Sequence, residues 1–173
     1  MLPDYRVRQR DYLLEISRAL TQELDLDKLL ERILAISADM LAGQAGLIAL
    51  RSEGGKWSVA STYGIPPTLT SYLEPLLAQV PDRDDARQFE LPEINRILQD
   101  VIRTISQGLL TGVGLPLIVM SRVIGVIFIF RNYRGIFSSN DRALLQSFAD
   151  QAAVAVNNAR LYSQIHQEKQ RLD

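Results

Sequence analysis

The chain has 173 residues, of which 47% are hydrophobic, and its basic and acidic side chains nearly balance at a formal net charge of −1. This predicts one domain with an apolar core and helical extensions, and it provides no basic field for nucleic acid. The absence of cysteine excludes disulfides, thiolate zinc sites, iron–sulfur clusters and cysteine nucleophiles. The polar first residues and the short apolar runs predict neither a signal peptide nor a membrane span, and hence a cytoplasmic domain.

Two helices are predicted at the start of the chain. Apolar side chains recur at helical spacing within residues 1–24, which we expect to form an N-terminal helix ahead of the domain. Asp25 is placed to cap the second helix, because its side-chain oxygen can accept hydrogen bonds from the first helical turn. That helix has an apolar stripe from Leu26 to Leu41, and Gly43 is its expected stop.

Short strands and helices follow. Residues 46–51 and 57–63 are predicted strands, joined by a two-residue turn at Gly54-Gly55 because glycine tolerates positive φ angles. Helices are predicted over residues 68–80 and 93–106, where apolar side chains again recur at helical spacing.

The stretch 113–130 organises the rest of the chain. Its two apolar runs flank the polar pair Ser121-Arg122, and each run has the length of a strand, which predicts an antiparallel hairpin. Neither run alternates between apolar and polar residues, so both faces of this hairpin should be covered. With a further edge strand expected near residues 88–91, the fold class is α+β, an antiparallel sheet with helices on both faces.

The last helix is predicted to begin at Ser138 or Ser139 and to continue without a break to the end of the chain. One alanine-rich stripe along it should pack on the domain. A second stripe resembles a coiled-coil seam between two chains; its residues are Leu144, Val154, Asn158, Leu161 and Ile165. A buried Asn158 would fix the register of two paired helices, whereas on a monomer it would be a partly exposed residue, and both interpretations stay open.

Several short motifs follow one another from the central hairpin to the last helix. They are Leu115-Pro116-Leu117, Val123-Ile124-Gly125-Val126-Ile127, Phe137-Ser138-Ser139-Asn140-Asp141, Ala149-Asp150-Gln151-Ala152-Ala153-Val154-Ala155 and Asn158-Ala159-Arg160-Leu161-Tyr162. In this order and at this spacing they resemble the C-terminal half of a GAF domain. The resemblance covers about residues 25–162, most closely from Gly108 onward, and leaves residues 163–173 as the start of a linker helix.

This resemblance implies a non-enzymatic sensory domain in signal transduction. It implies a GAF-like antiparallel sheet of about five or six strands, long N- and C-terminal helices on one face that form a homodimer, and a small-molecule pocket on the other face. It also implies an output domain downstream, such as a histidine kinase of a two-component system or a diguanylate cyclase. The rival interpretation is a ligand-free structural dimerisation module whose pocket is filled by its own side chains.

Candidate ligand-binding residues lie on the expected pocket face or on the segments that cover it. They are Arg51, Thr62, Tyr63, Arg87, Thr111 and Phe128. Arg51 and Arg87 are suited to hold an anionic ligand through a forked guanidinium contact, and the alternative, equally open, is that both are surface residues.

Departures from the family pattern restrict the identity of a cofactor or ligand, which the sequence leaves unknown. Without cysteine no bilin can be attached covalently. The single histidine, His166, lies in the charged tail, so we expect neither haem ligation nor a transition-metal site.

The cyclic-nucleotide branch of the family is the most informative comparison. Its motif has an Asn-Lys pair followed by Phe, Asp and Glu. Here Asn132, Phe137 and Asp141 match this motif, whereas Tyr133 and Arg142 replace the lysine and the glutamate. The Lys–Asp ion pair of the motif therefore cannot form, which argues against a cyclic-nucleotide ligand.

Overall fold

The computed structural model describes residue 10 and residues 25–80, 92–106 and 108–172. The predicted N-terminal helix lies outside these residues except for Arg10. The predicted edge strand near residues 88–91, the candidate Arg87 and the side chain of His166 also lie outside the description.

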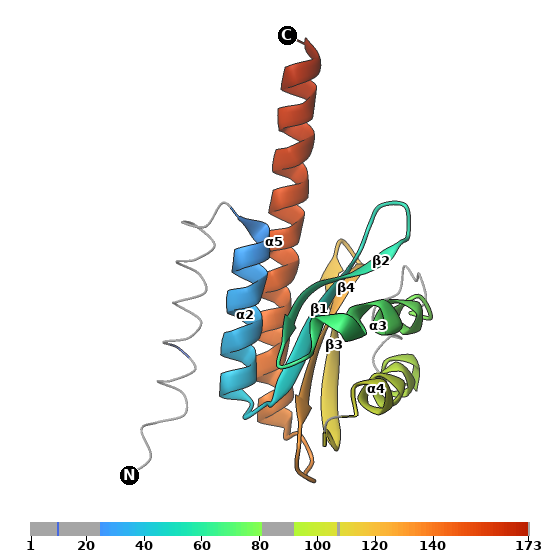
Figure 1. Ribbon diagram of the computed structural model, residues 1–173. Helices are drawn as coiled ribbons and strands as arrows, with labels where there is room; N and C mark the ends of the chain where they lie inside the picture. Colours follow the sequence, from blue (N-terminus) through green and yellow to red (C-terminus); the bar gives the residue numbers. More distant parts are fainter. Residues whose placement is uncertain (1–9, 11–24, 81–91, 107, 173) are drawn as a thin grey trace.

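A four-stranded antiparallel sheet lies between two layers of helices (Figure 1). The strand order is β2-β1-β4-β3, and each neighbouring pair is antiparallel. The elements are α2 (Leu26–Met40), β1 (Ala45–Arg51), β2 (Trp57–Tyr63), η1 (Pro67–Leu69), α3 (Thr70–Leu77), α4 (Pro92–Ile105), β3 (Thr111–Val119), β4 (Arg122–Arg131) and α5 (Ser139–Leu172).

The prediction of an α+β fold with covered faces is confirmed, but the predicted strand number is wrong. Among the described residues the sheet has four strands rather than five or six. The expected additional strand near residues 88–91 lies outside the described residues, so the four strands are those of the described part of the chain.

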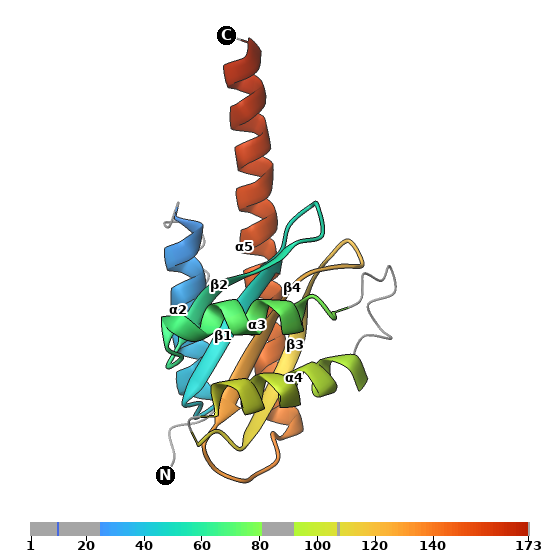
Figure 2. The same ribbon diagram turned by 45° about the vertical axis from the view of Figure 1, so that its right-hand side comes forward.

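The sheet separates two apolar clusters (Figures 1 and 2). Helices α2 and α5 cover one side, here called the α2/α5 face, and helices α3 and α4 cover the other, the α3/α4 face. Strand β4 serves both clusters: Ile127 and Ile129 pack toward α2 and α5, whereas Phe128 and Phe130 pack toward α3 and α4. This two-sided burial explains why the central hairpin has two continuous apolar runs.

The turns of the two hairpins differ from each other. Met120 and Ser121 form the two-residue turn between β3 and β4, with φ angles of 52° and 66° in the left-handed region. Between β1 and β2 the predicted two-residue Gly-Gly turn is wrong. Ser52 N–H donates to the Lys56 carbonyl at 2.8 Å, which closes a longer loop in which Gly55 has a φ of 85°. A positive φ is needed at that one position, so Gly54 is not required for the turn.

Both ends of α2 are fixed by local hydrogen bonds. Asp25 caps the helix as predicted, accepting from the backbone N–H of Asp27 at 3.0 Å. At the other end Gly43 N–H donates to the Ala38 carbonyl at 2.7 Å, and the left-handed residue is Ala42, with a φ of 54°. Gly43 has a different role from the one predicted: a Cβ there would lie 2.6 Å from Ile129 Cγ2, so glycine permits close approach to β4.

Helix α5 has 34 residues and begins with a reciprocal cap. The Asp141 N–H donates to Ser138 Oγ and the Ser138 N–H donates to Asp141 Oδ2, both at 3.0 Å. The predicted alanine-rich stripe is buried as far as Ala155, and α5 then continues beyond the sheet and α2 (Figure 1). Within the described part of the chain, none of the helices combines the length and the apolarity needed to cross a membrane.

Candidate functional site

The expected ligand pocket lies on the α3/α4 face, where the described side chains form a continuous apolar cluster. Phe128 is fully buried there, and its ring centroid lies 6.1 Å from that of Phe130. The cluster includes Leu73 and Leu77 of α3 and Leu98 of α4. These described side chains line the space between the two helices and the sheet.

Gly112 shows how closely α4 approaches the sheet. A Cβ at this position would lie 2.8 Å from Phe130 Cδ1 and 3.0 Å from Leu98 Cδ1. The missing side chain therefore lets Leu98 of α4 and Phe130 of β4 meet over β3, as expected of a strand glycine at a close approach.

The described candidate ligand residues do not gather at one place. Thr62 and Phe128 both lie opposite Leu47, so they share a row across the sheet. Thr111 lies at the other end of the hairpin from its turn and donates to the Tyr133 carbonyl at 3.1 Å. Arg51 lies at the far end of β1, where its Nη1 donates to the Val123 carbonyl at 3.4 Å.

Tyr63 is also set apart from this row. It ends β2, is 41% exposed, and pairs with Gly46 rather than Leu47. Of the described candidates, Thr62 and Phe128 therefore lie in one row on the α3/α4 face. Contact between any of the candidates and a ligand remains a prediction.

The candidate dimer stripe on α5 is buried at its start and exposed where the helix leaves the domain. Leu144 is fully buried in the core of its own chain, so its place in an exposed seam is wrong. By contrast Val154, Leu161 and Ile165 are 51%, 48% and 67% exposed, and Asn158 is exposed between them. These four residues follow the spacing of a coiled-coil seam on the part of α5 that leaves the domain.

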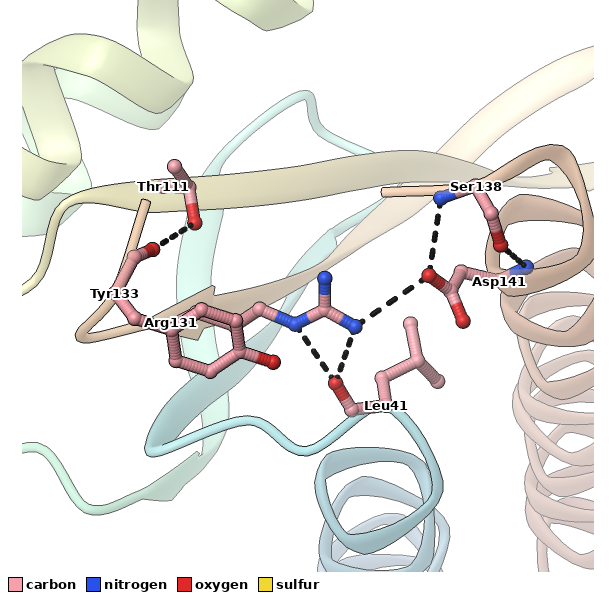
Figure 3. A network of polar contacts seen from close by, with 6 residues as sticks. All are labelled: Leu41, Thr111, Arg131, Tyr133, Ser138 and Asp141. Atoms are coloured by element: carbon pink, nitrogen blue, oxygen red, sulfur yellow. Dashed lines mark hydrogen bonds and ion pairs between the residues drawn. The ribbon is translucent and has the colours of Figure 1, made fainter. Parts of the chain in front are cut away.

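The sequence did not predict a buried polar network at the other end of α5 (Figure 3). Arg131, the last residue of β4, is 7% exposed. Its Nε and Nη2 donate to the Leu41 carbonyl at 2.8 and 2.6 Å, and its Nη2 lies 3.4 Å from Asp141 Oδ2. Its guanidinium carbon lies 3.8 Å from the ring centroid of Phe137.

This network joins three elements. Arg131 extends from β4 to a carbonyl at the C-terminus of α2, the negative end of that helix, and to the carboxylate that caps the N-terminus of α5. The sequence signal was present: an arginine ends an apolar strand shortly before a Phe-Ser-x-x-Asp helix start. Asp141 thus does have a cationic partner, although Tyr133 replaces the lysine of the cyclic-nucleotide motif.

Comparison with known families agrees with this arrangement. The sequence model for the GAF domain matches residues 23–157. The chain belongs to the GAF domain family. No curated protein matches the sequence at a significant level.

Solved GAF domains share the fold at low sequence identity. The GAF domain of a protein assigned as a sensor histidine kinase from Pseudomonas syringae pv. tomato is 16% identical, with a TM-score of 0.67 and coverage of 94% of each chain. One from a phosphoenolpyruvate-protein phosphotransferase of Coxiella burnetii is 13% identical, with a TM-score of 0.66 and coverage of 91% of this chain and 97% of that chain.

A phycoerythrobilin-bound GAF domain from a cyanobacterial phytochrome is 15% identical, with a TM-score of 0.62 and coverage of 90% of this chain and 97% of that chain. The solved relatives thus include GAF domains of sensory signalling proteins, among them a sensor histidine kinase and a phytochrome. At these identities the likeness to single structures shows the fold alone.

Proposed function

We propose that this GAF domain is a non-enzymatic sensory module of a cytoplasmic signalling protein, and that α5 relays its state to an output domain downstream, such as a histidine kinase or a diguanylate cyclase. The observation that carries the proposal is the exposed stripe of Val154, Asn158, Leu161 and Ile165. Its residues project from a helix whose first half is part of the domain core, so one rigid element connects the core to a surface suited to pairing.

The exposed stripe supports a homodimer. Apolar side chains at this spacing become buried when two helices wrap around each other, and the burial favours association. A polar Asn158 in the middle of the seam costs stability but selects the register in which the two asparagines meet. The relay would consist of a change in how the two α5 helices pair.

The first test replaces Asn158 with leucine. We expect Asn158→Leu to strengthen self-association or to admit additional registers and oligomers, because it removes the polar position from the seam. Analytical ultracentrifugation measures the association constant. Ser163→Leu is the matched control, because Ser163 is an exposed polar residue on another side of the same helix. A monomer for wild type and both variants would contradict the seam.

A small-molecule ligand under the α4 cover is part of this sensory proposal. Such a ligand shifts the pairing of α5 only if it binds the two helix arrangements with different affinities. Hydrogen exchange of α5 with and without the ligand measures this coupling, and equal exchange rates would contradict it.

The packed α3/α4 face favours a second candidate, a ligand-free structural dimerisation module. Phe128, Phe130 and Leu98 are buried in one apolar cluster on this face, which supports a module whose own side chains fill the expected ligand space. A thermal-shift screen with nucleotides, amino acids, bilins, haem and organic acids separates the two functions. A ligand that binds the native state raises the melting temperature with its concentration, whereas no response to any compound would favour the structural module.

A further inference from the structure

A pocket of about 440 Å³ lies on the α2/α5 face, on the opposite side of the sheet from the expected ligand site. The tips of both hairpins and the middle of α5 frame it. Its lining residues are Arg51, Ser52, Glu53, Val119, Met120, Arg122, Val123, Ile124, Asn157 and Arg160. The hairpin tips point toward the same end of the molecule as the projecting part of α5 (Figure 1).

The lining is strongly cationic for a chain with a net charge of −1. Guanidinium groups come from three elements: Arg51 from β1, Arg122 from β4 and Arg160 from α5. Among the lining residues the one carboxylate is Glu53, and its Oε1 already accepts from Gln164 Nε2 at 3.0 Å. The pocket therefore combines excess positive charge with the neutral polar side chains of Ser52 and Asn157.

Arg160 already connects α5 to the tip of the first hairpin. It is half-buried, and its Nη2 donates to the Arg51 carbonyl at 2.5 Å. A guanidinium has five N–H donors in a planar fork, so this single bond leaves Arg160 able to contact an oxyanion as well. Arg51 in turn donates to Val123 of the second hairpin. The three elements thus meet through arginine side chains.

The turn beside the pocket has a common hairpin conformation but unusual residues for it. Met120 and Ser121 both have positive φ angles, which favour glycine or asparagine, and the Met120 side chain is 91% exposed. A non-glycine residue in this region costs free energy, and such residues cluster at binding sites. Met120 therefore places a flexible apolar side chain at the rim of a cationic pocket.

We propose that this pocket binds a small oxyanion, a phosphate or carboxylate group of a metabolite, and that the bound anion clamps α5 to the two hairpin tips. Forked guanidinium groups suit such an anion because they donate paired hydrogen bonds to its oxygens. The site lies on the other face from the ligand site of the proposed function and acts where α5 leaves the domain, so either site can exist without the other.

The test is an NMR titration of the full chain labelled with ¹⁵N-arginine, with inorganic phosphate in one arm and malonate in the other. Sodium chloride keeps the ionic strength constant, because general screening would otherwise mimic binding. We expect saturable shifts of the Arg160 and Arg122 Nε–Hε signals. A response to phosphate alone identifies a phosphate ligand, and a response to malonate alone identifies a carboxylate ligand.

Three variants make the result specific. Arg160→Gln should weaken binding by about tenfold or more, since it removes charge-assisted hydrogen bonds to the anion. Arg122→Gln should also weaken binding, and because Arg122 is exposed this variant tests the site even if Arg160→Gln fails to fold. Arg142→Gln is the matched control, since it removes the same charge from an exposed site in the first turn of α5.

Two results would overturn the proposal. The first is the absence of a saturable shift with both anions. The second is equal weakening by Arg142→Gln and by the pocket variants, which would show a response to net charge alone. Neither result bears on the thermal-shift screen or on the association of α5, so failure of this site is distinguishable from failure of the proposed function.

Discussion

The two faces of the sheet are built by different means. On the α3/α4 face the described core is apolar throughout, with Phe128 and Phe130 as its largest fully buried members. On the α2/α5 face an apolar core is supplemented by buried polar groups, such as Arg131 bonded to Leu41 and Ser37 bonded to Ile33. Hydrogen bonds specify one geometry, whereas an apolar cluster tolerates repacking. The first face is thus better suited to adaptation, and the second to fixing the helix that leaves the domain.

The largest expected effect comes from removing the central ring of the apolar face. Phe128→Ala should lower the free energy of unfolding by about 3–5 kcal/mol, because a fully buried phenyl group is replaced by a cavity. Chemical denaturation measures this difference. Ile136→Ala, at a residue that is 93% exposed, should change stability by no more than about 0.5 kcal/mol. Equal stabilities for the two variants would show that the α3/α4 face is not a packed core.

A smaller loss is expected on the polar face. Arg131→Gln should destabilise the domain by about 2–3 kcal/mol, because the Leu41 carbonyl and Asp141 lose their cationic partner. Denaturation measures the loss, and hydrogen exchange should show it at the adjoining ends of α2 and α5. Arg134→Gln, at an exposed site in the same loop region, serves as the control. A neutral Arg131→Gln would mean that apolar packing alone positions these helices.

The smallest expected effect is a gain. Ala42→Gly should stabilise the protein by about 1 kcal/mol, because Ala42 holds the left-handed position at the end of α2, next to the Leu41 carbonyl. Differential scanning calorimetry would record a higher melting temperature. Gly43→Ala should do the opposite, since its Cβ would lie 2.6 Å from Ile129 Cγ2. A destabilised Ala42→Gly would contradict the assigned role of Ala42.

The parts of the fold set by local pattern could be predicted from the sequence. The apolar runs of the central hairpin, the Asp25 cap and the alanine stripe of the last helix each indicated an element that the structure contains. These features depend on neighbours along the chain, and a period or a capping side chain reveals them directly.

Features that depend on contacts between distant segments were missed. Arg131 and Leu41 are bonded across 90 residues of sequence, and Arg160 and Arg51 across 109. No local pattern encodes such pairs. The same limit explains why Leu144 was assigned to the seam. Its helical spacing fits both the core and the seam, and its burial depends on where α5 leaves the domain.

The continuity of α5 has a mechanical consequence. From Asn157 to Leu172 the helix extends about 24 Å at its usual rise per residue, without an interruption. A tilt of about 5° at the base would therefore displace the far end by about 2 Å over this length. A change in helix tilt too small to alter the fold therefore produces a larger displacement at the C-terminal end of α5. A distance probe should be attached at that end.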